Sequence, residues 1–232
     1  MTDTSRITRS PDERVYAAIY RAVQERRLQP GVKLKEVELA QLFKVSRTSV
    51  RSALLRLSHT GLVDLMPNRG AAVARLSADD VRQLLAARRA VEVAMVETIA
   101  LHGTDESIAI LQRHVEAQRD AFMAGRPDEG MRLAISFHRV LAAQSGNRIL
   151  ARFLDDLLSR MPLVTLSHGR VPALGDATHA EHIDLVEAIA ARDPERARAI
   201  LVAHLKSLED QLDLDAPSQS RSLADMLDLQ GD

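Results

Sequence analysis

The stretch LKEVELAQLFKVSRTSVRSALLRLSHTGLVDLMPNRGAAV, residues 34–73, decides the fold of the N-terminal part of the chain. Apolar residues at helical spacing predict a short helix over residues 36–43 and a second helix that begins at residue 47. Two short β-prone segments, residues 62–66 and 71–74, flank a Pro-Asn-Arg-Gly turn and predict a small hairpin. Two helices followed by a hairpin is the element order of a winged helix–turn–helix.

A further helix is expected before this stretch. Apolar positions recur every three to four residues from Pro11 to Leu28, and Gln29-Pro30-Gly31 ends the pattern. In the second helix of the pair, Ser46 stands where a side chain can cap the helix N-terminus. The buried side of that helix is expected to consist of Val50, Leu54 and Leu57.

After residue 76 the pattern is purely helical. Ser77-Ala78-Asp79-Asp80 has the form of a capping box and predicts a long helix that reaches about residue 101. Breaks at glycine, serine and proline predict further helices over about 105–124, 128–144, 147–167, 177–192 and 194–213. The protein is therefore expected to be mainly α. A winged helix–turn–helix domain over residues 1–76 precedes an all-α bundle of six or seven helices over residues 77–232.

The two predicted domains carry opposite charge. Residues 1–76 contain 14 Lys and Arg against 7 Asp and Glu, a net of +7, whereas residues 77–232 contain 17 against 25, a net of −8. A basic unit joined to an acidic one indicates a nucleic-acid-binding domain attached to a domain with another role.

Composition excludes several classes of protein. The chain has no cysteine, which excludes disulfide scaffolds, thiolate zinc fingers, iron–sulfur clusters and cysteine nucleophiles. No apolar run approaches the roughly 20 residues of a membrane span, and the first residues have no signal-peptide core. We therefore expect a soluble, cytoplasmic protein without a membrane partner.

The residues that start the second helix of the pair are candidates for reading DNA. In a helix–turn–helix these residues face base edges in the major groove. Here they are Arg47, Thr48 and, one turn later, Arg51, and arginine can bond to guanine O6 and N7 at once. An isolated pair of arginines at this spacing is more often simply solvated. Further candidates for phosphate or minor-groove contact are Ser46, Thr48, Ser49, Asn68, Arg69 and Gly70.

Three helices of the acidic half each place a histidine on an apolar side: His138, His182 and His204. One such histidine is more often a hydrogen-bonded core residue than a ligand. Three together favour a shared partner such as a metal ion, because buried imidazoles need partners. On the first helix of the bundle, Arg88 and Glu92 also fall on the apolar side, and a buried arginine needs an anion. That anion is either Glu92 or a bound acid.

The N-terminal sequence resembles the GntR family of bacterial transcription regulators. The motifs that carry this resemblance are Leu28-Gln29-Pro30-Gly31, Glu38-Leu39-Ala40, Val45-Ser46-Arg47-Thr48, Val50-Arg51-Ser52-Ala53-Leu54, Gly61-Leu62-Val63 and Arg69-Gly70. Residues 78–213 resemble the FadR subfamily, whose effector domain is an all-α bundle termed FCD. The matching positions are Arg88 through Glu92, Phe137-His138, Ser145-Gly146-Asn147, Glu181-His182, Ala188-Ile189, Asp193 and His204-Leu205.

The resemblance implies a ligand-responsive regulator that binds a palindromic operator in double-stranded DNA as a homodimer. A small carboxylate effector in the helical domain would change its affinity for DNA. Some members have an arginine in the first helix of the motif, where this chain has Val37, and Lys35 is the nearest substitute. The residues expected to contact the effector are Arg88, Glu92 and Asn147, although capping a helix is the simpler role for Asn147.

The resemblance also implies a metal site that this chain changes. In metal-containing members, three histidines and a carboxylate one turn before the first of them hold Zn, Ni or a similar divalent ion. The histidines correspond to His138, His182 and His204, but the carboxylate position is Ala134. Three imidazoles with an open position still suit zinc. A metal-free pocket, in which the histidines bind the acid directly, is the alternative.

Two other functions are compatible with parts of the sequence. Three histidines with an open position also describe a metal-dependent enzyme, but no carboxylate stands at the spacing of a general base, and the basic domain is left unexplained. A DNA-binding protein without an effector would not need the buried polar cluster. The regulator therefore accounts for more of the sequence.

Overall fold

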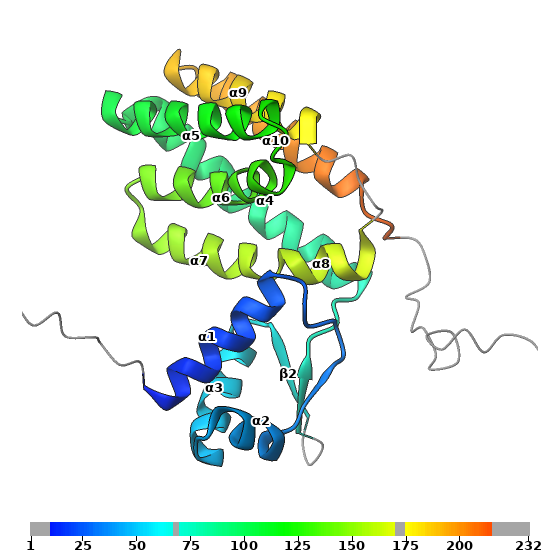
Figure 1. Cartoon of the computed structure of the whole chain (residues 1–232). Helices are drawn as coiled ribbons and strands as arrows, with labels where there is room; N and C mark the ends of the chain where they lie inside the picture. The colour runs from blue at the N-terminus through cyan, green and yellow to red at the C-terminus, as the bar shows by residue number, and fades with distance from the viewer. Residues whose placement is uncertain (1–9, 67–69, 170–174, 215–232) are drawn as a thin grey trace, which may run out of the picture.

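The computed structural model describes residues 10–66, 70–169 and 175–214. The winged helix–turn–helix predicted for the N-terminal part is confirmed and occupies the lower half of the molecule in Figure 1. Its elements are α1 (Pro11–Gln24), β1 (Lys33–Leu34), α2 (Glu36–Phe43), α3 (Arg47–His59), β2 (Val63–Met66) and β3 (Gly70–Val73).

The wing is a three-stranded antiparallel sheet in the order β1-β3-β2. The hairpin pairs Val63 with Val73 and Met66 with Gly70, close to the predicted strands. The sequence did not predict β1, because two residues are too few to show the alternation of a strand. The expected wing-tip residues Asn68 and Arg69 lie outside the described residues.

Local signals fix the helices of this domain. Ser46 caps α3 as expected, since its Oγ accepts a hydrogen bond from the Ser49 backbone N at 3.1 Å. Helix α1 ends four residues before the predicted end, because Arg26 adopts a left-handed conformation with φ of 57°. The predicted buried residues of α3 lie in one core with α1 and the wing, which includes Val15, Ile19, Val50, Leu54, Leu57, Leu62 and Val73.

The second part of the chain is a helical bundle, seen above the winged domain in Figure 1. The capping box at Ser77 and Asp80 is present, with Ser77 Oγ accepting from the Asp80 backbone N at 3.1 Å. The helices are α4 (Ala78–His102), α5 (Asp105–Met123), α6 (Pro127–Gln144), α7 (Arg148–Ser159), α8 (Met161–His168), α9 (Gly175–Ala190) and α10 (Pro194–Asp210).

The single helix predicted over residues 147–167 is wrong, because the structure divides it into α7 and α8 at Arg160. Pro162 explains the break: it has no N–H for the carbonyl four residues earlier, and its ring clashes with that carbonyl. The turn brings α8 against the winged domain. Leu163 is buried in the core of that domain, and Arg160 Nε donates to the Thr60 carbonyl at 2.7 Å.

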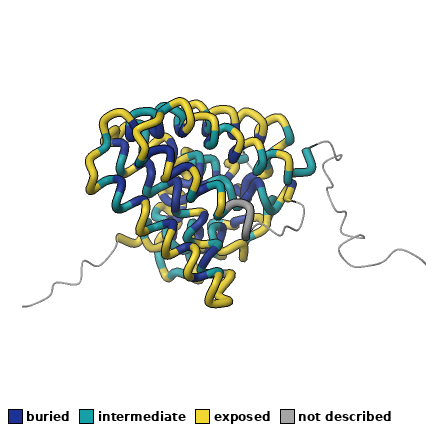
Figure 2. The backbone as a smooth tube through the Cα atoms, turned by 90° about the horizontal axis from the view of Figure 1, so that it is seen from above, coloured by how far each residue is buried: buried dark blue, intermediate teal, exposed yellow. Residues whose placement is uncertain are grey.

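The main core of the bundle joins α4, α5, α6, α7, α9 and α10, and Figure 2 shows buried residues running through the middle of the molecule. Within the described part of the chain, no helix is both long and apolar enough to cross a membrane. The helices that the sequence predicted to carry histidines, α6, α9 and α10, all contribute to this core.

Candidate functional site

The start of α3 presents its polar side chains to solvent. Arg47 and Arg51 are 60% and 66% exposed, and both reach the same carboxylate on α2. Arg51 Nε donates to Glu36 Oε1 at 2.8 Å, and Arg47 Nη2 donates to Glu36 Oε2 at 3.3 Å. Hydrogen bonds from both arginines, chiefly from Arg51, hold the pKa of Glu36 below its usual range despite the opposing effect of burial. The two arginines are thus tied across the helix pair.

Five other described residues were predicted to contact DNA. Ser46 and Ser49 share a hydrogen bond between their hydroxyls at 2.8 Å, so these groups are already used at the cap. Lys35 is exposed and lies 3.6 Å from Glu38, while Thr48 and Gly70 are exposed. Val37, which stands where the resemblance would place an arginine, is 52% exposed.

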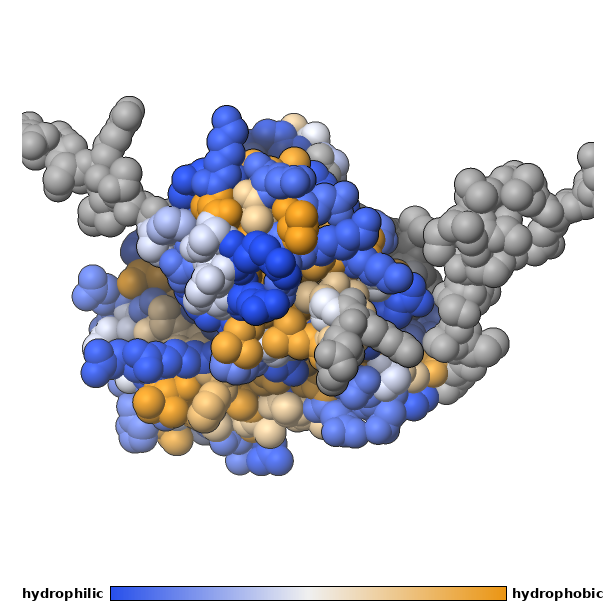
Figure 3. Space-filling model, turned by 90° about the horizontal axis from the view of Figure 1, so that it is seen from below, coloured by the Kyte–Doolittle hydropathy of each residue, from blue (hydrophilic) through white to orange (hydrophobic). Residues whose placement is uncertain are grey.

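A groove of about 750 Å³ lies between α2, α3 and the wing, lined by residues that include Lys33, Glu36, Arg47, Arg51 and Gly70. Figure 3 shows the molecule from below, where hydrophilic side chains surround a smaller number of apolar ones. A hollow with arginines on one wall and an antiparallel wing on the other has the chemistry of a nucleic-acid interface.

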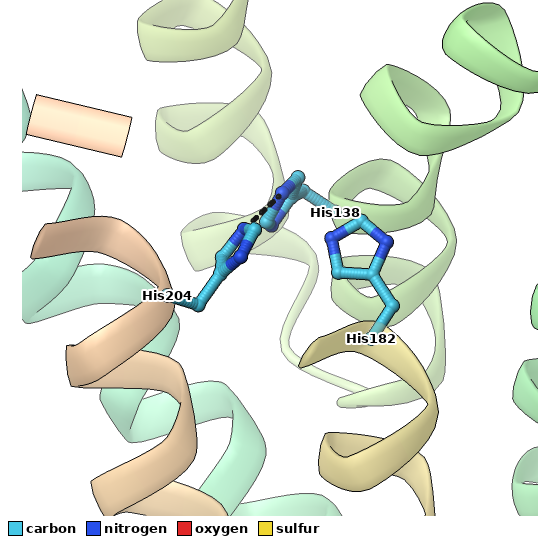
Figure 4. A group of neighbouring side chains, drawn as sticks. All are labelled: His138, His182 and His204. Carbon is cyan, nitrogen blue, oxygen red and sulfur yellow. Dashed lines mark hydrogen bonds between the residues drawn. The ribbon is translucent and has the colours of Figure 1, made fainter. Parts of the chain in front are cut away.

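The three predicted histidines converge in the bundle interior. His138 comes from α6, His182 from α9 and His204 from α10, and each is at most 4% exposed. One nitrogen atom from each lies within 4.8 Å of the others, and Figure 4 shows the rings turned toward one another. The Nε2 atoms of His138 and His204 are 3.4 Å apart. The cluster could hold a metal ion.

An oxygen acceptor on the opposite side fixes each imidazole. The three contacts are His138 Nδ1 to Glu92 Oε2 at 2.6 Å, His204 Nδ1 to Glu181 Oε2 at 2.7 Å and His182 Nδ1 to Gln118 Oε1 at 3.1 Å. Since each of these oxygens accepts, each Nδ1 donates, and the Nε2 atom of a neutral ring is left with a lone pair. This second set of partners is typical of histidines that bind metal ions.

Burial favours the neutral form of His138 and His182. Burial, with help from Arg88, lowers the pKa of His138 to about 4 against the opposing effect of Glu92. Burial and the neighbouring His138 and His204 hold the pKa of His182 well below its usual range. At neutral pH the Nε2 atoms of His138 and His182 are therefore acceptors, and His182 Nε2 has no hydrogen-bond partner among the described residues.

Arg88 and Glu92 form a buried ion pair on α4, with Arg88 Nε 2.5 Å from Glu92 Oε1. Burial opposes ionisation of Glu92, but Arg88 and His138 outweigh it and lower the pKa of Glu92 to about 2. Of the two anions expected for Arg88, Glu92 or a bound acid, the structure shows Glu92. Arg88 Nη2 is nevertheless buried without a hydrogen-bond partner among the described residues.

Two further residues modify the predicted site. Ala134 is buried one turn before His138 on α6. This is the position at which the resemblance would place a carboxylate ligand. Asn147 lies elsewhere: it is exposed and caps α7, its Oδ1 accepting from the backbone N atoms of Ile149 and Leu150, both at 3.1 Å. The structure therefore supports the capping role for Asn147.

Sequence reasoning missed Gln118 and Glu181 as partners of the histidines. Gln118 on α5 is fully buried. The sequence could have indicated it, because Gln118 is a polar residue on the side of the helix that also carries Leu111 and Val115. Glu181 directly precedes His182 and gave no such signal, because an acidic residue beside a polar one on a helix is ordinary. Only the packing of α9 against α10 brings Glu181 to His204.

Comparison with known proteins identifies both parts of the chain. Residues 83–207 match the model of the FCD domain, and residues 11–73 match that of the bacterial regulatory proteins of the gntR family. The chain belongs to the GntR family, with an FCD domain of the FadR subfamily type.

The relatives of this GntR-family protein include curated repressors. It is 32% identical to the HTH-type transcriptional repressor NanR of Salmonella newport over 197 residues, which is 75% of this chain and 74% of NanR. It is 24% identical to the HTH-type transcriptional repressor RspR of Escherichia coli over 208 residues, 88% of this chain and 90% of RspR.

Two solved structures share the fold. A putative transcriptional regulator GntR from Rhodococcus sp. RHA1 superposes with a TM-score of 0.76 at 23% identity, covering 90% of this chain and all of the other. E. coli McbR/YncC gives a TM-score of 0.70 at 22% identity, covering 88% and 97%. The chain is a transcription regulator of this family, and the alternative of a metal-dependent enzyme is not supported.

Proposed function

We propose that this GntR-family regulator binds a palindromic operator as a cytoplasmic homodimer and changes its DNA affinity when a small carboxylic acid binds in the FCD domain. A divalent metal ion, Zn or Ni, is proposed to share the pocket with the acid. The boundary between the DNA-binding and effector domains is proposed at residues 76 and 77.

The observation that carries the proposed metal site is that three Nε2 atoms face a common point, while each Nδ1 is held by an oxygen on the other side of its ring. Lone pairs of buried imidazoles repel one another unless an electron acceptor lies between them. Three neutral nitrogen donors suit zinc and nickel, and the oxygen partners on Nδ1 raise their basicity. When bound, such an ion would supply Lewis acidity toward an oxygen of the effector.

The buried ion pair supports the choice of a carboxylate as effector. Arg88 lies close enough to His138 and His182 to lower the pKa of both, and its Nη2 atom has no partner among the described residues. A carboxylate bound there would accept a charge-assisted hydrogen bond from that atom. With Ala134 in place of a fourth protein ligand, water or an effector oxygen would complete the coordination of the metal.

The proposed DNA contacts follow from the exposed start of α3. Arg47, Thr48 and Arg51 are assigned to base edges in the major groove, where arginine pairs with guanine. A second group is assigned to phosphates or the minor groove and comprises Lys35, Ser46, Ser49, Asn68, Arg69 and Gly70. The support for this assignment is the exposure of Arg47 and Arg51 beside the groove between α2, α3 and the wing.

The test uses the full-length protein and an operator selected by it from a random duplex pool. Small carboxylic acids are screened by thermal unfolding with zinc and with a chelator, and each hit is tested for its effect on operator affinity. The expected result is an acid that raises the melting temperature, as a ligand of the native state must, and that shifts the operator Kd. A stabilising acid that works equally well in chelator would favour the metal-free pocket. An operator affinity that no stabilising acid changes would contradict the proposed function.

A further inference from the structure

A single carboxylate organises both arginines of the recognition helix. Glu36 is the first residue of α2, and its side chain is only 20% exposed, against 60% and 66% for Arg47 and Arg51. Arg51 Nε lies 2.8 and 3.0 Å from the two Glu36 oxygens, and Arg47 Nη2 lies 3.3 Å from one of them. Since the two arginines are one turn apart on α3, one carboxylate on the neighbouring helix can reach both.

The contact engages the inner side of the Arg51 guanidinium. A guanidinium carries five N–H donors in a planar fork, and Glu36 uses the Nε donor. The outer edge, formed by Nη1 and Nη2, has the geometry that pairs with O6 and N7 of guanine. An arginine already held in one orientation loses less side-chain entropy when it binds a base than a freely rotating one does.

Glu36 could have one of three roles, and each predicts a different effect of its charge on DNA binding. An exposed ion pair contributes little to the free energy of folding. If the contacts of Glu36 were only such ion pairs, replacing Glu36 would therefore leave DNA recognition unchanged. A carboxylate that merely competed with DNA for the arginines would weaken binding to every sequence, because it adds negative charge where phosphates bind. A carboxylate that orients the arginines strengthens binding to the correct sequence alone.

We propose that Glu36 is a positioning residue for base readout, which aligns Arg47 and Arg51 so that they discriminate guanine in the operator. The proposal rests on the assignment of these two arginines to base edges. It adds a residue on α2 that determines specificity without itself contacting a base.

The experiment measures Kd for the operator selected by the wild-type protein and for a scrambled duplex of equal length, at two salt concentrations. The variants are Glu36→Gln, Glu36→Asp, which keeps the charge but shortens the side chain, and the control Glu38→Gln. Glu38 is also on α2, is 60% exposed and pairs with Lys35, so its substitution removes the same charge without touching either arginine. Thermal unfolding checks that each variant is folded.

We expect Glu36→Gln and Glu36→Asp to lower the ratio of operator to scrambled affinity at least about fivefold, the lower end of what one bidentate base contact provides. Glu38→Gln should leave that ratio unchanged. Repeating the selection with Glu36→Gln should relax the preference at guanine positions. In an Arg51→Ala background, Glu36→Gln should have a much smaller effect, because the main group that it positions is gone.

Two results would overturn the inference, and they are distinguishable. If Arg51→Ala lowers the affinity ratio but Glu36→Gln leaves it unchanged or raises it, Glu36 is a surface partner or a competitor of DNA. If Arg51→Ala itself leaves the ratio unchanged, the assignment of Arg51 to a base edge fails, and the positioning role of Glu36 fails with it.

Discussion

Replacing Ala134 with aspartate should separate a metal site from a purely organic pocket. Ala134 is 5% exposed and stands one turn before His138 on α6, so an aspartate there would project on the same side of the helix as the histidine. With a metal ion bound, an anionic oxygen would join three neutral nitrogen donors. Without one, the same carboxylate would be buried beside neutral imidazoles.

The two states should respond in opposite directions. In the chelated protein, a buried polar group without partners costs about 1–3 kcal/mol, and a charged one costs more. For a chain of this size that corresponds to a melting temperature about 2–12 °C lower. In the zinc-loaded protein the new ligand should tighten binding by about 10–100-fold, the range that even an outer partner of a ligand controls. At saturating zinc this is about 1.4–2.8 kcal/mol of added stabilisation.

The assay compares Ala134→Asp with Ala134→Asn, which has the same shape without the charge. Zinc affinity is measured by competition with a chromophoric chelator, and melting temperatures are measured with chelator and with zinc. His182→Ala serves as the variant with a ligand removed. Equal zinc affinity for the Asp and Asn variants would refute the idea that position 134 faces the ion. Equal and negligible zinc in the native protein, Ala134→Asp and His182→Ala would leave a metal-free pocket.

Three further predictions test the interface, the assembly and the cluster. Arg47→Ala and Arg51→Ala should each weaken operator binding by about 5–150-fold with the fold intact, because both side chains are exposed, and unchanged footprints of the double variant would contradict this. The protein should sediment as a homodimer at micromolar concentration and protect two half-sites, whereas a monomer protecting one would exclude that assembly. In chelator, stability should fall between about pH 6.5 and 4, because burial lowers the pKa of His138 to about 4 and that of His182 well below its usual value. In this window the unfolded chain binds more protons than the folded chain. The free energy of unfolding therefore falls by up to about 1.4 kcal/mol per pH unit for each histidine as the pH is lowered. Urea unfolding that is independent of pH in this window would refute the neutral state of His138 and His182 in the folded protein. Glu92 does not confuse the result, because its lowered pKa of about 2 affects stability only below about pH 4.5.

The starts of α3, α4 and α10 depended on local chemistry and were therefore predictable. The cap at Ser46, the capping box at Ser77 and the proline at position 194 each satisfy or remove backbone donors within a few residues. The break at Arg160 was missed, because proline also occurs in the first turn of a helix, and the sequence does not show whether a helix stops or continues there.

By itself, the sequence determined the winged helix–turn–helix, the helical bundle, the family and the three histidines on buried sides of their helices. These follow from periodicity and caps, whose causes lie within a few residues, and from motifs at fixed spacing. Only the tertiary structure decided which nitrogen of each histidine faces the cluster, because Glu92, Gln118 and Glu181 come from other helices than the histidines they bind. It likewise decided that Glu36 holds both arginines of α3. The physical reason is that side-chain hydrogen bonds between elements depend on how the helices pack, and no local pattern in the chain encodes that packing.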